Sequence, residues 1–101
     1  MLTIVQSRSF IRNCDGKYGD EEIDRLLDQL SRDPKSGKKL QAAGNLFQYR
    51  WHTSLHRKQE YDVYYIYHSK TQPLLLVDIF KQGTKAILDK VLASLALEIT
   101  G

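Results

Sequence analysis

The sequence predicts an α+β domain in which helices pack on an antiparallel β-sheet of about four strands. Two segments, 46–52 and 61–68, alternate apolar and polar residues with the period of a strand. Two others, 23–30 and 87–99, repeat leucine and isoleucine at the spacing of an amphipathic helix. A chain of 101 residues can bury one modest core, so we expect a single domain over residues 1–101.

The first elements are a short strand and a short helix. Residues 2–6 are β-prone and predict the first strand. Residues 7–13 predict a short helix with Phe10 and Ile11 facing the core, and the glycines that follow end it.

A second helix is predicted from Asp20 to Asp33. Asp20 is a good N-cap, and Glu21 and Glu22 suit the positive end of the helix dipole. The helix should end at Asp33 because Pro34 disfavours the α conformation in the residue before it.

The second half predicts three strands and a helix. Residues 34–45 read as a polar loop, after which the two alternating segments and residues 74–80 form an antiparallel meander. A tight connection is expected at 69–72. Thr84 can cap a final helix with a wide apolar stripe. The predicted architecture therefore has two N-terminal helices and one C-terminal helix on the sheet.

Charge is unevenly distributed along the chain. The formal net charge is +3, but residues 1–33 carry five basic and seven acidic side chains, whereas residues 34–90 carry ten basic and four acidic. A positive region of this kind is typical of proteins that bind nucleic acid or an acidic partner, and a solvated surface without a ligand is the alternative. The single Cys14 and the absence of a long apolar segment or signal sequence predict a cytoplasmic protein.

Several segments together resemble a known family. The segments are Leu30 to Gly37, with its Asp-Pro turn, Gly44 to Trp51, Tyr61 to Tyr65, Leu74 to Gln82, and Thr84-Lys85. In this order and spacing they resemble the RelE/HigB superfamily of toxins from bacterial type II toxin–antitoxin modules, in its phage-derived HigB-like branch. The resemblance covers nearly the whole chain.

The resemblance implies a function and partners. Such toxins are metal-independent ribonucleases without a cofactor that cleave mRNA, commonly in the ribosomal A site, and so inhibit translation. An antitoxin encoded beside the toxin neutralises it, and we expect the two to form a heterotetramer or a larger complex. Some relatives poison DNA gyrase instead, so the fold alone does not decide the target.

Three residues are predicted to carry the chemistry. Metal-free RNA cleavage requires deprotonation of the 2′-OH, stabilisation of the phosphorane and protonation of the leaving oxygen. Arg50 and His52 lie on one face of their strand and suit the phosphate and the proton transfer, respectively. Lys81 is placed beside them by the resemblance. The alternative for Arg50 is an ion pair with Asp62 across the sheet.

A second set of residues is predicted to bind the substrate. Tyr64 lies on the face of Arg50 and could stack on a base of single-stranded RNA. The remaining residues are cationic or imidazole side chains, for which solvated surface positions are the alternative: Lys38, Lys39, His56, Arg57, Lys58 and Lys85. The spacing of His52 and His56 near Asp62 is compatible with a metal site, but without a convincing third ligand we expect no metal.

Two positions depart from the family pattern. Asp62 stands where catalytic relatives typically carry a phosphate-binding arginine, and Ile87 and Leu88 stand where some place a functional tyrosine. The chemistry could lie in the 52–58 loop, or the chain could have lost activity and kept binding. The alternatives to an mRNA endonuclease are therefore a non-catalytic binder, as a gyrase poison or an inactive homologue that binds an antitoxin, and a general RNA-binding module.

Overall fold

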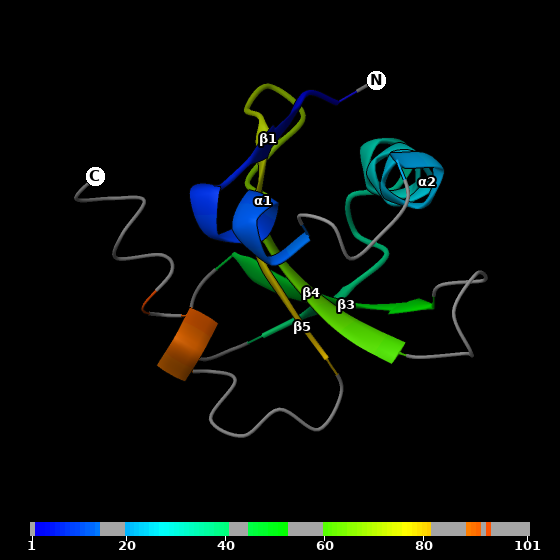
Figure 1. Ribbon diagram of the computed structural model, residues 1–101. Coiled ribbons are helices and arrows are strands. Elements are labelled where there is room, and N and C mark those ends of the chain that lie inside the picture. The colour runs from blue at the N-terminus through cyan, green and yellow to red at the C-terminus, as the bar shows by residue number, and fades with distance from the viewer. Residues whose placement is uncertain are drawn as a thin grey trace.

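The computed structural model describes residues 2–14, 20–40, 45–52, 60–81, 89–91 and 93, and within them the chain has an α+β fold (Figure 1). In chain order the elements are β1 (Ile4–Gln6), α1 (Arg8–Cys14), α2 (Asp20–Arg32), β2 (Lys38–Lys39), β3 (Leu46–His52), β4 (Glu60–Ile66) and β5 (Leu74–Lys81). Residues 89–91 and 93 are also helical.

The described strands form one mixed sheet in the order β1-β5-β4-β3-β2. The predicted meander is confirmed, because β3, β4 and β5 pair antiparallel in succession. The prediction of about four strands, all antiparallel, is wrong in two respects. A short strand β2 adds to β3, and β1 pairs with β5 in parallel, with Ile4 opposite Leu74. A parallel pair requires a long connection between its two strands. Here the connection from β1 to β5 includes α1 and α2.

Helix α1 begins at a buried serine. The Ser7 hydroxyl accepts a hydrogen bond from the Phe10 N–H at 3.0 Å and donates one to the Val77 carbonyl at 2.5 Å. Ser7 therefore caps the helix and attaches it to β5. Phe10 is fully buried as predicted, but Ile11 is 53% exposed, which contradicts the prediction that it faces the core.

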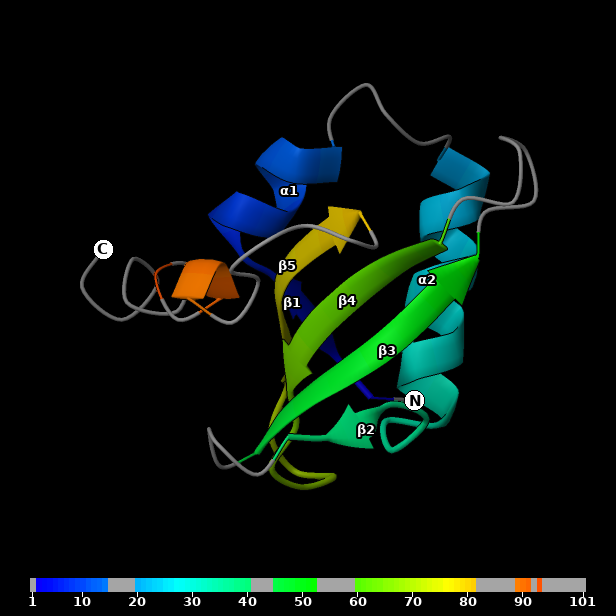
Figure 2. The ribbon, with the colours of Figure 1, turned by 90° about the horizontal axis from the view of Figure 1, so that it is seen from below.

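Helix α2 covers one face of the sheet with the predicted apolar stripe. Leu26 and Leu30 are buried, and Ile23 and Leu27 pack against the same cluster. On the sheet side this larger core contains Phe47, Trp51, Val63, Tyr65, Leu76 and Ile79. Figure 2, seen from below, shows the strands in front of α2, so the opposite face of the sheet is turned towards the viewer.

The turn after α2 is held against the sheet by Tyr65. Its hydroxyl donates a hydrogen bond to the Pro34 carbonyl at 2.7 Å and accepts one from the Gly37 N–H at 3.0 Å. A Cβ atom at Gly37 would lie 2.7 Å from the Gln48 carbonyl oxygen, so only glycine fits without a shift. Burial raises the pKa of Tyr65.

The other face of the sheet carries a smaller core. Leu46, Tyr64, Val77 and Val91 are buried together there. Val91 comes from the helical residues 89–91, which lie on the side of the sheet away from α1 and α2 (Figure 1). The predicted start of this helix at Thr84 lies outside the described residues.

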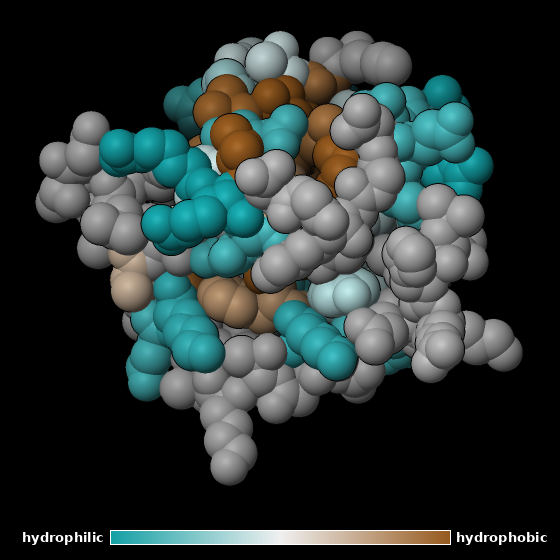
Figure 3. Space-filling view, in the orientation of Figure 1, coloured by the Kyte–Doolittle hydropathy of each residue, from teal (hydrophilic) through white to brown (hydrophobic). Residues whose placement is uncertain are grey.

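Apolar surface is visible near the N-terminus. Val5 and Ile11 are the large hydrophobic side chains exposed in the described part of the chain, and Figure 3 shows apolar residues at the surface in the region of β1 and α1. Among the described residues, no helix has both the length and the apolar character needed to cross a bilayer.

Candidate functional site

Strand pairing brings four polar residues together on the face opposite α2. Arg50 is directly opposite Asp62, and His52 is directly opposite Glu60. Directly opposed residues of an antiparallel pair point to the same side of the sheet. We call Arg50, His52, Glu60 and Asp62 the β3–β4 cluster. In Figure 2 no described helix overlies the ends of β3 and β4 that carry it.

The side chains of the β3–β4 cluster form a connected set of ion pairs. Arg50 Nε lies 3.5 Å from Asp62 Oδ1 and 3.9 Å from Glu60 Oε2. His52 Nδ1 lies 3.6 Å from Glu60 Oε1. Glu60 therefore links the guanidinium to the imidazole. The pairing of Arg50 with Asp62, which was the alternative to a free phosphate ligand, is confirmed.

Burial differs sharply within the cluster. The Arg50 and His52 side chains are 52% and 64% exposed, whereas the Asp62 side chain is only 6% exposed. Asp62 Oδ1 is inaccessible to solvent and has no hydrogen bond among the described residues. The contact with Arg50 is thus the main compensation for a buried negative charge.

The cluster is not a strongly positive patch. With a neutral imidazole its two carboxylates outnumber the single guanidinium, and with a protonated imidazole the charges balance. The sequence predicted a basic face at this position. The difference arises because Glu60 and Asp62 lie opposite the cations in the strand register.

Tyr64 does not offer a stacking surface. It is 4% exposed, lies among Leu46, Val77 and Val91, and meets Phe80 edge-on with ring centroids 6.2 Å apart. The prediction that it stacks on an RNA base is therefore wrong for this conformation. Burial, reinforced by the Asp62 carboxylate and opposed by Arg50, raises the pKa of Tyr64 to about 12.

Lys81 does not join Arg50 and His52. It is in register with Tyr61, which is in register with Trp51 on the α2 side of the sheet. The pleat therefore assigns Lys81 to the opposite face from the β3–β4 cluster. The prediction that Lys81 converges with Arg50 and His52 is wrong. Phe80, which is in register with Asp62, lies on the face of the cluster, and Lys81 is the next residue along β5.

The other predicted substrate ligands are only partly described. Lys38 and Lys39 are exposed on the edge strand β2, with Lys38 opposite Gln48 and hence on the face of Arg50. Lys39 is opposite the buried Phe47 and belongs to the other face. The predicted ligands in the 53–59 and 82–88 segments, His56, Arg57, Lys58 and Lys85, lie outside the described residues.

Glu60 was missed by the sequence reasoning. Glu60 stands one residue before the predicted strand, so the sequence pattern did not assign it to either face of the sheet. The signal that could have found it is the pairing of Arg50 with Asp62, because that register places Glu60 opposite His52 two positions further on.

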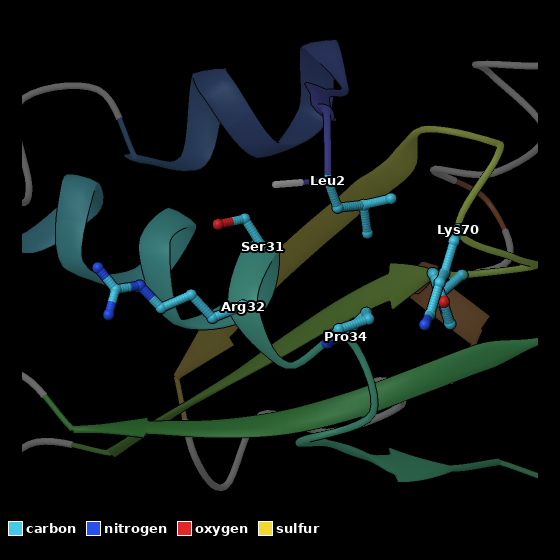
Figure 4. A pocket seen from close by; sticks show the side chains of 6 residues that line it. Leu2, Ser31, Arg32, Pro34 and Lys70 are labelled. Atoms are coloured by element: carbon cyan, nitrogen blue, oxygen red, sulfur yellow. The ribbon is translucent and has the colours of Figure 1, made fainter.

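Two of the hollows that described residues border lie near the sheet. One, of about 310 Å³, lies between α2 and β3 and is bordered by Glu22, Arg25, Gln29, Tyr49, Trp51 and His52. The other, of about 440 Å³, is lined by Leu2, Ser31, Arg32, Pro34, Tyr67 and Lys70 (Figure 4). This second hollow lies near the C-terminal end of β4. At a rise of about 3.3 Å per residue along the strand, that end is roughly 20 Å from the cluster.

The β3–β4 cluster is the centre of the candidate site. The first hollow meets it only at His52, because α2, Tyr49 and Trp51 place that hollow on the other face of the sheet. In the part of the chain that the structure describes, no three His, Cys, Asp or Glu residues are placed to hold a metal ion. No protein-family profile and no curated protein matches the sequence, so the function is argued from the site itself.

Proposed function

We propose that the chain is the toxin component of a type II toxin–antitoxin module and cleaves mRNA on the ribosome without a metal ion. The observation that carries the proposal is the contact set Arg50–Glu60–His52 on one accessible end of β3 and β4. A carboxylate within 4 Å of both a cation and an imidazole forms a set of groups that can supply the functions that metal-free RNA cleavage needs.

Each residue has a role in the proposed reaction. His52 takes the proton of the 2′-OH, and Glu60, 3.6 Å from Nδ1, stabilises the imidazolium that forms. The 2′-oxygen attacks phosphorus while the bond to the 5′-oxygen breaks, and the departing oxygen takes a proton from water. Arg50 stabilises the negative charge that develops on the phosphorane. The products are a 2′,3′-cyclic phosphate and a 5′-hydroxyl.

Two further features support RNA as the substrate. The exposed Lys38 on β2 shares the face of the cluster and can contact the phosphate backbone. Apart from the short strand β2, the elements follow the order β-α-α, meander and helical residues, which together with the local sequence segments carries the resemblance to the RelE/HigB toxins.

The proposal is tested by expressing the chain in a bacterial host without an antitoxin. Growth arrest should be accompanied by new mRNA ends that follow codon phase and carry 5′-hydroxyls, which are ligated to an adaptor only after treatment with a kinase. New ends with 5′-phosphates would contradict the 2′-OH mechanism, and arrest without new ends would contradict cleavage altogether. Co-expression with the product of a neighbouring short gene should restore growth if that gene encodes the antitoxin.

One observation favours a second candidate, a non-catalytic binding protein. Glu60 and Asp62 both approach Arg50, so its charge is already compensated before any phosphate arrives. Such a protein would act through contacts with an antitoxin or with gyrase. Induction of the DNA-damage response without new mRNA ends would identify gyrase as the target and displace the nuclease proposal.

A further inference from the structure

We propose that Asp62 is a positioning residue for Arg50: its buried carboxylate holds the Nε side of the guanidinium, so that the terminal nitrogens are presented to a phosphate. This inference rests on the proposed ribonuclease function, in which Arg50 binds the scissile phosphate. It gives a role to the carboxylate that otherwise argues against catalysis at this site.

The contact geometry determines which edge of Arg50 is occupied. The closest approach to Asp62 and to Glu60 is made by Nε in both cases, at 3.5 and 3.9 Å. The terminal Nη1 and Nη2 atoms therefore lie farther from these carboxylates, on a side chain that is half exposed. A guanidinium has five donors in a planar fork, so one edge can be held while another binds an anion bidentately.

Stability alone does not account for a carboxylate at position 62. Its neighbour in register on β5 is Phe80, and Tyr64 lies next along the same face. Burying a carboxylate costs several kcal/mol even when it is paired, and apolar replacements of buried ion pairs are often neutral or stabilising. A buried Asp62 is better explained by the orientation it imposes on Arg50.

Glu60 does not replace Asp62 in this role. It is 31% exposed, lies farther from Arg50 and also contacts His52. Among the described residues, the ion pair of Asp62 is with Arg50 alone. Asp62 thus acts on the phosphate ligand, and Glu60 acts mainly on the proton carrier.

Two explanations of Asp62 predict opposite signs. If its charge merely repels phosphate, Asp62→Asn should strengthen RNA binding. If it positions Arg50, the same change should weaken binding, because the guanidinium loses its anchor. The effect should also disappear when Arg50 is absent, since residues that act as a unit have non-additive effects.

The experiment measures binding and cleavage separately. Binding uses a fluorescent oligoribonucleotide with 2′-O-methyl groups, which cannot be cleaved because the nucleophile is blocked. Cleavage is followed in translating extracts on unmodified mRNA. The variants are Asp62→Asn, Arg50→Ala, the double variant and Arg50→Lys, and Asp28→Asn is the matched control because it removes a carboxylate from the Arg32 pair on α2.

We expect Asp62→Asn to weaken binding and slow cleavage about tenfold, with no further loss in the Arg50→Ala background. Asp28→Asn should bind at least as tightly as the wild type. Arg50→Lys should lose about as much as Arg50→Ala, because an ammonium lacks the planar fork that binds a phosphate bidentately while its other edge is held. This variant tests the proposal even if Asp62→Asn does not fold.

The outcomes separate this inference from the proposed function. A wild-type protein that neither binds nor cleaves RNA would remove the function and the inference together. An active wild type with unchanged or tighter binding by Asp62→Asn, additive losses in the double variant, or full binding by Arg50→Lys would overturn the inference alone.

Discussion

Arg50 on β3 lies directly opposite Asp62 on β4, with Nε 3.5 Å from Oδ1, and one partner is half exposed while the other is buried. The register that creates this pair also places Glu60 opposite His52. Both features of the candidate site, the oriented cation and the supported imidazole, therefore follow from one strand alignment. A shift of one residue in this pairing would place Arg50 and His52 on the opposite face of the sheet from Glu60 and Asp62.

Replacing Arg50 should destabilise the fold. Arg50→Ala leaves the buried carboxylate of Asp62 without its ion pair, which we expect to lower the free energy of unfolding by about 1–3 kcal/mol. Urea denaturation measures this. Arg32→Ala is the control, because its pair with Asp28 is exposed and should contribute roughly 0.5 kcal/mol or less. Equal losses for the two variants would show that burial of Asp62 has no energetic weight.

Stability should fall at alkaline pH through Tyr64. Its pKa is about 12 in the folded protein and near 10.0 in the unfolded chain, so between these values only the unfolded state releases the proton. Stability from this group is complete below pH 10 and is lost as pH rises towards 12. Between pH 9 and 11.5 the free energy of unfolding should fall by about 2 kcal/mol less in Tyr64→Phe than in the wild type, as measured by urea denaturation. Parallel pH curves for the variant and the wild type would refute this account.

Gly37 should not tolerate a side chain. In Gly37→Ala the new Cβ would meet the Gln48 carbonyl oxygen at 2.7 Å and the Tyr65 hydroxyl at 2.9 Å, so the turn after α2 must move. We expect a loss of about 1–3 kcal/mol in stability. Lys38→Ala, one position further on an exposed strand, should be nearly neutral. A thermal midpoint unchanged by Gly37→Ala would mean that the turn adapts freely.

Ser7 should stabilise both α1 and its attachment to the sheet. Ser7→Ala removes the cap on the Phe10 N–H and the hydrogen bond to the Val77 carbonyl, both of which are buried. The expected loss is about 1–2 kcal/mol. Ser69→Ala removes an exposed hydroxyl contact with Thr71 and provides the matched control. If both serine variants unfold at the wild-type urea midpoint, the cap is unimportant.

Much of the fold could be predicted because its signals are local. The apolar stripe of α2, its end before Pro34 and the alternation in β3 depend on neighbours within a few residues, and all three are observed. The parallel pairing of β1 with β5 joins residues 70 positions apart, so no local pattern could reveal it. The two-residue strand β2 is similarly set by contact with β3 and by the turn at Gly37.

The candidate site was predictable only in part. Alternation correctly placed Arg50 and His52 on one face and named Asp62 as a partner of Arg50. The burial of Tyr64 depends on Val77 and Val91, which come from elements distant in sequence. The face of Lys81 depends on the register with Tyr61, and the irregularity between Tyr64 and Tyr65 shifts the pairing further along β4.

The central claim is that the β3–β4 cluster cleaves RNA, and mapping of mRNA 5′ ends in cells that express His52→Ala tests it most directly. His68→Ala is the matched control, because His68 is exposed at the other end of β4 and contacts Asn45. We expect wild type and His68→Ala to produce the same 5′-hydroxyl ends, and His52→Ala, at equal levels of folded protein, to reduce them by about a hundredfold. Undiminished cleavage by His52→Ala would contradict the account.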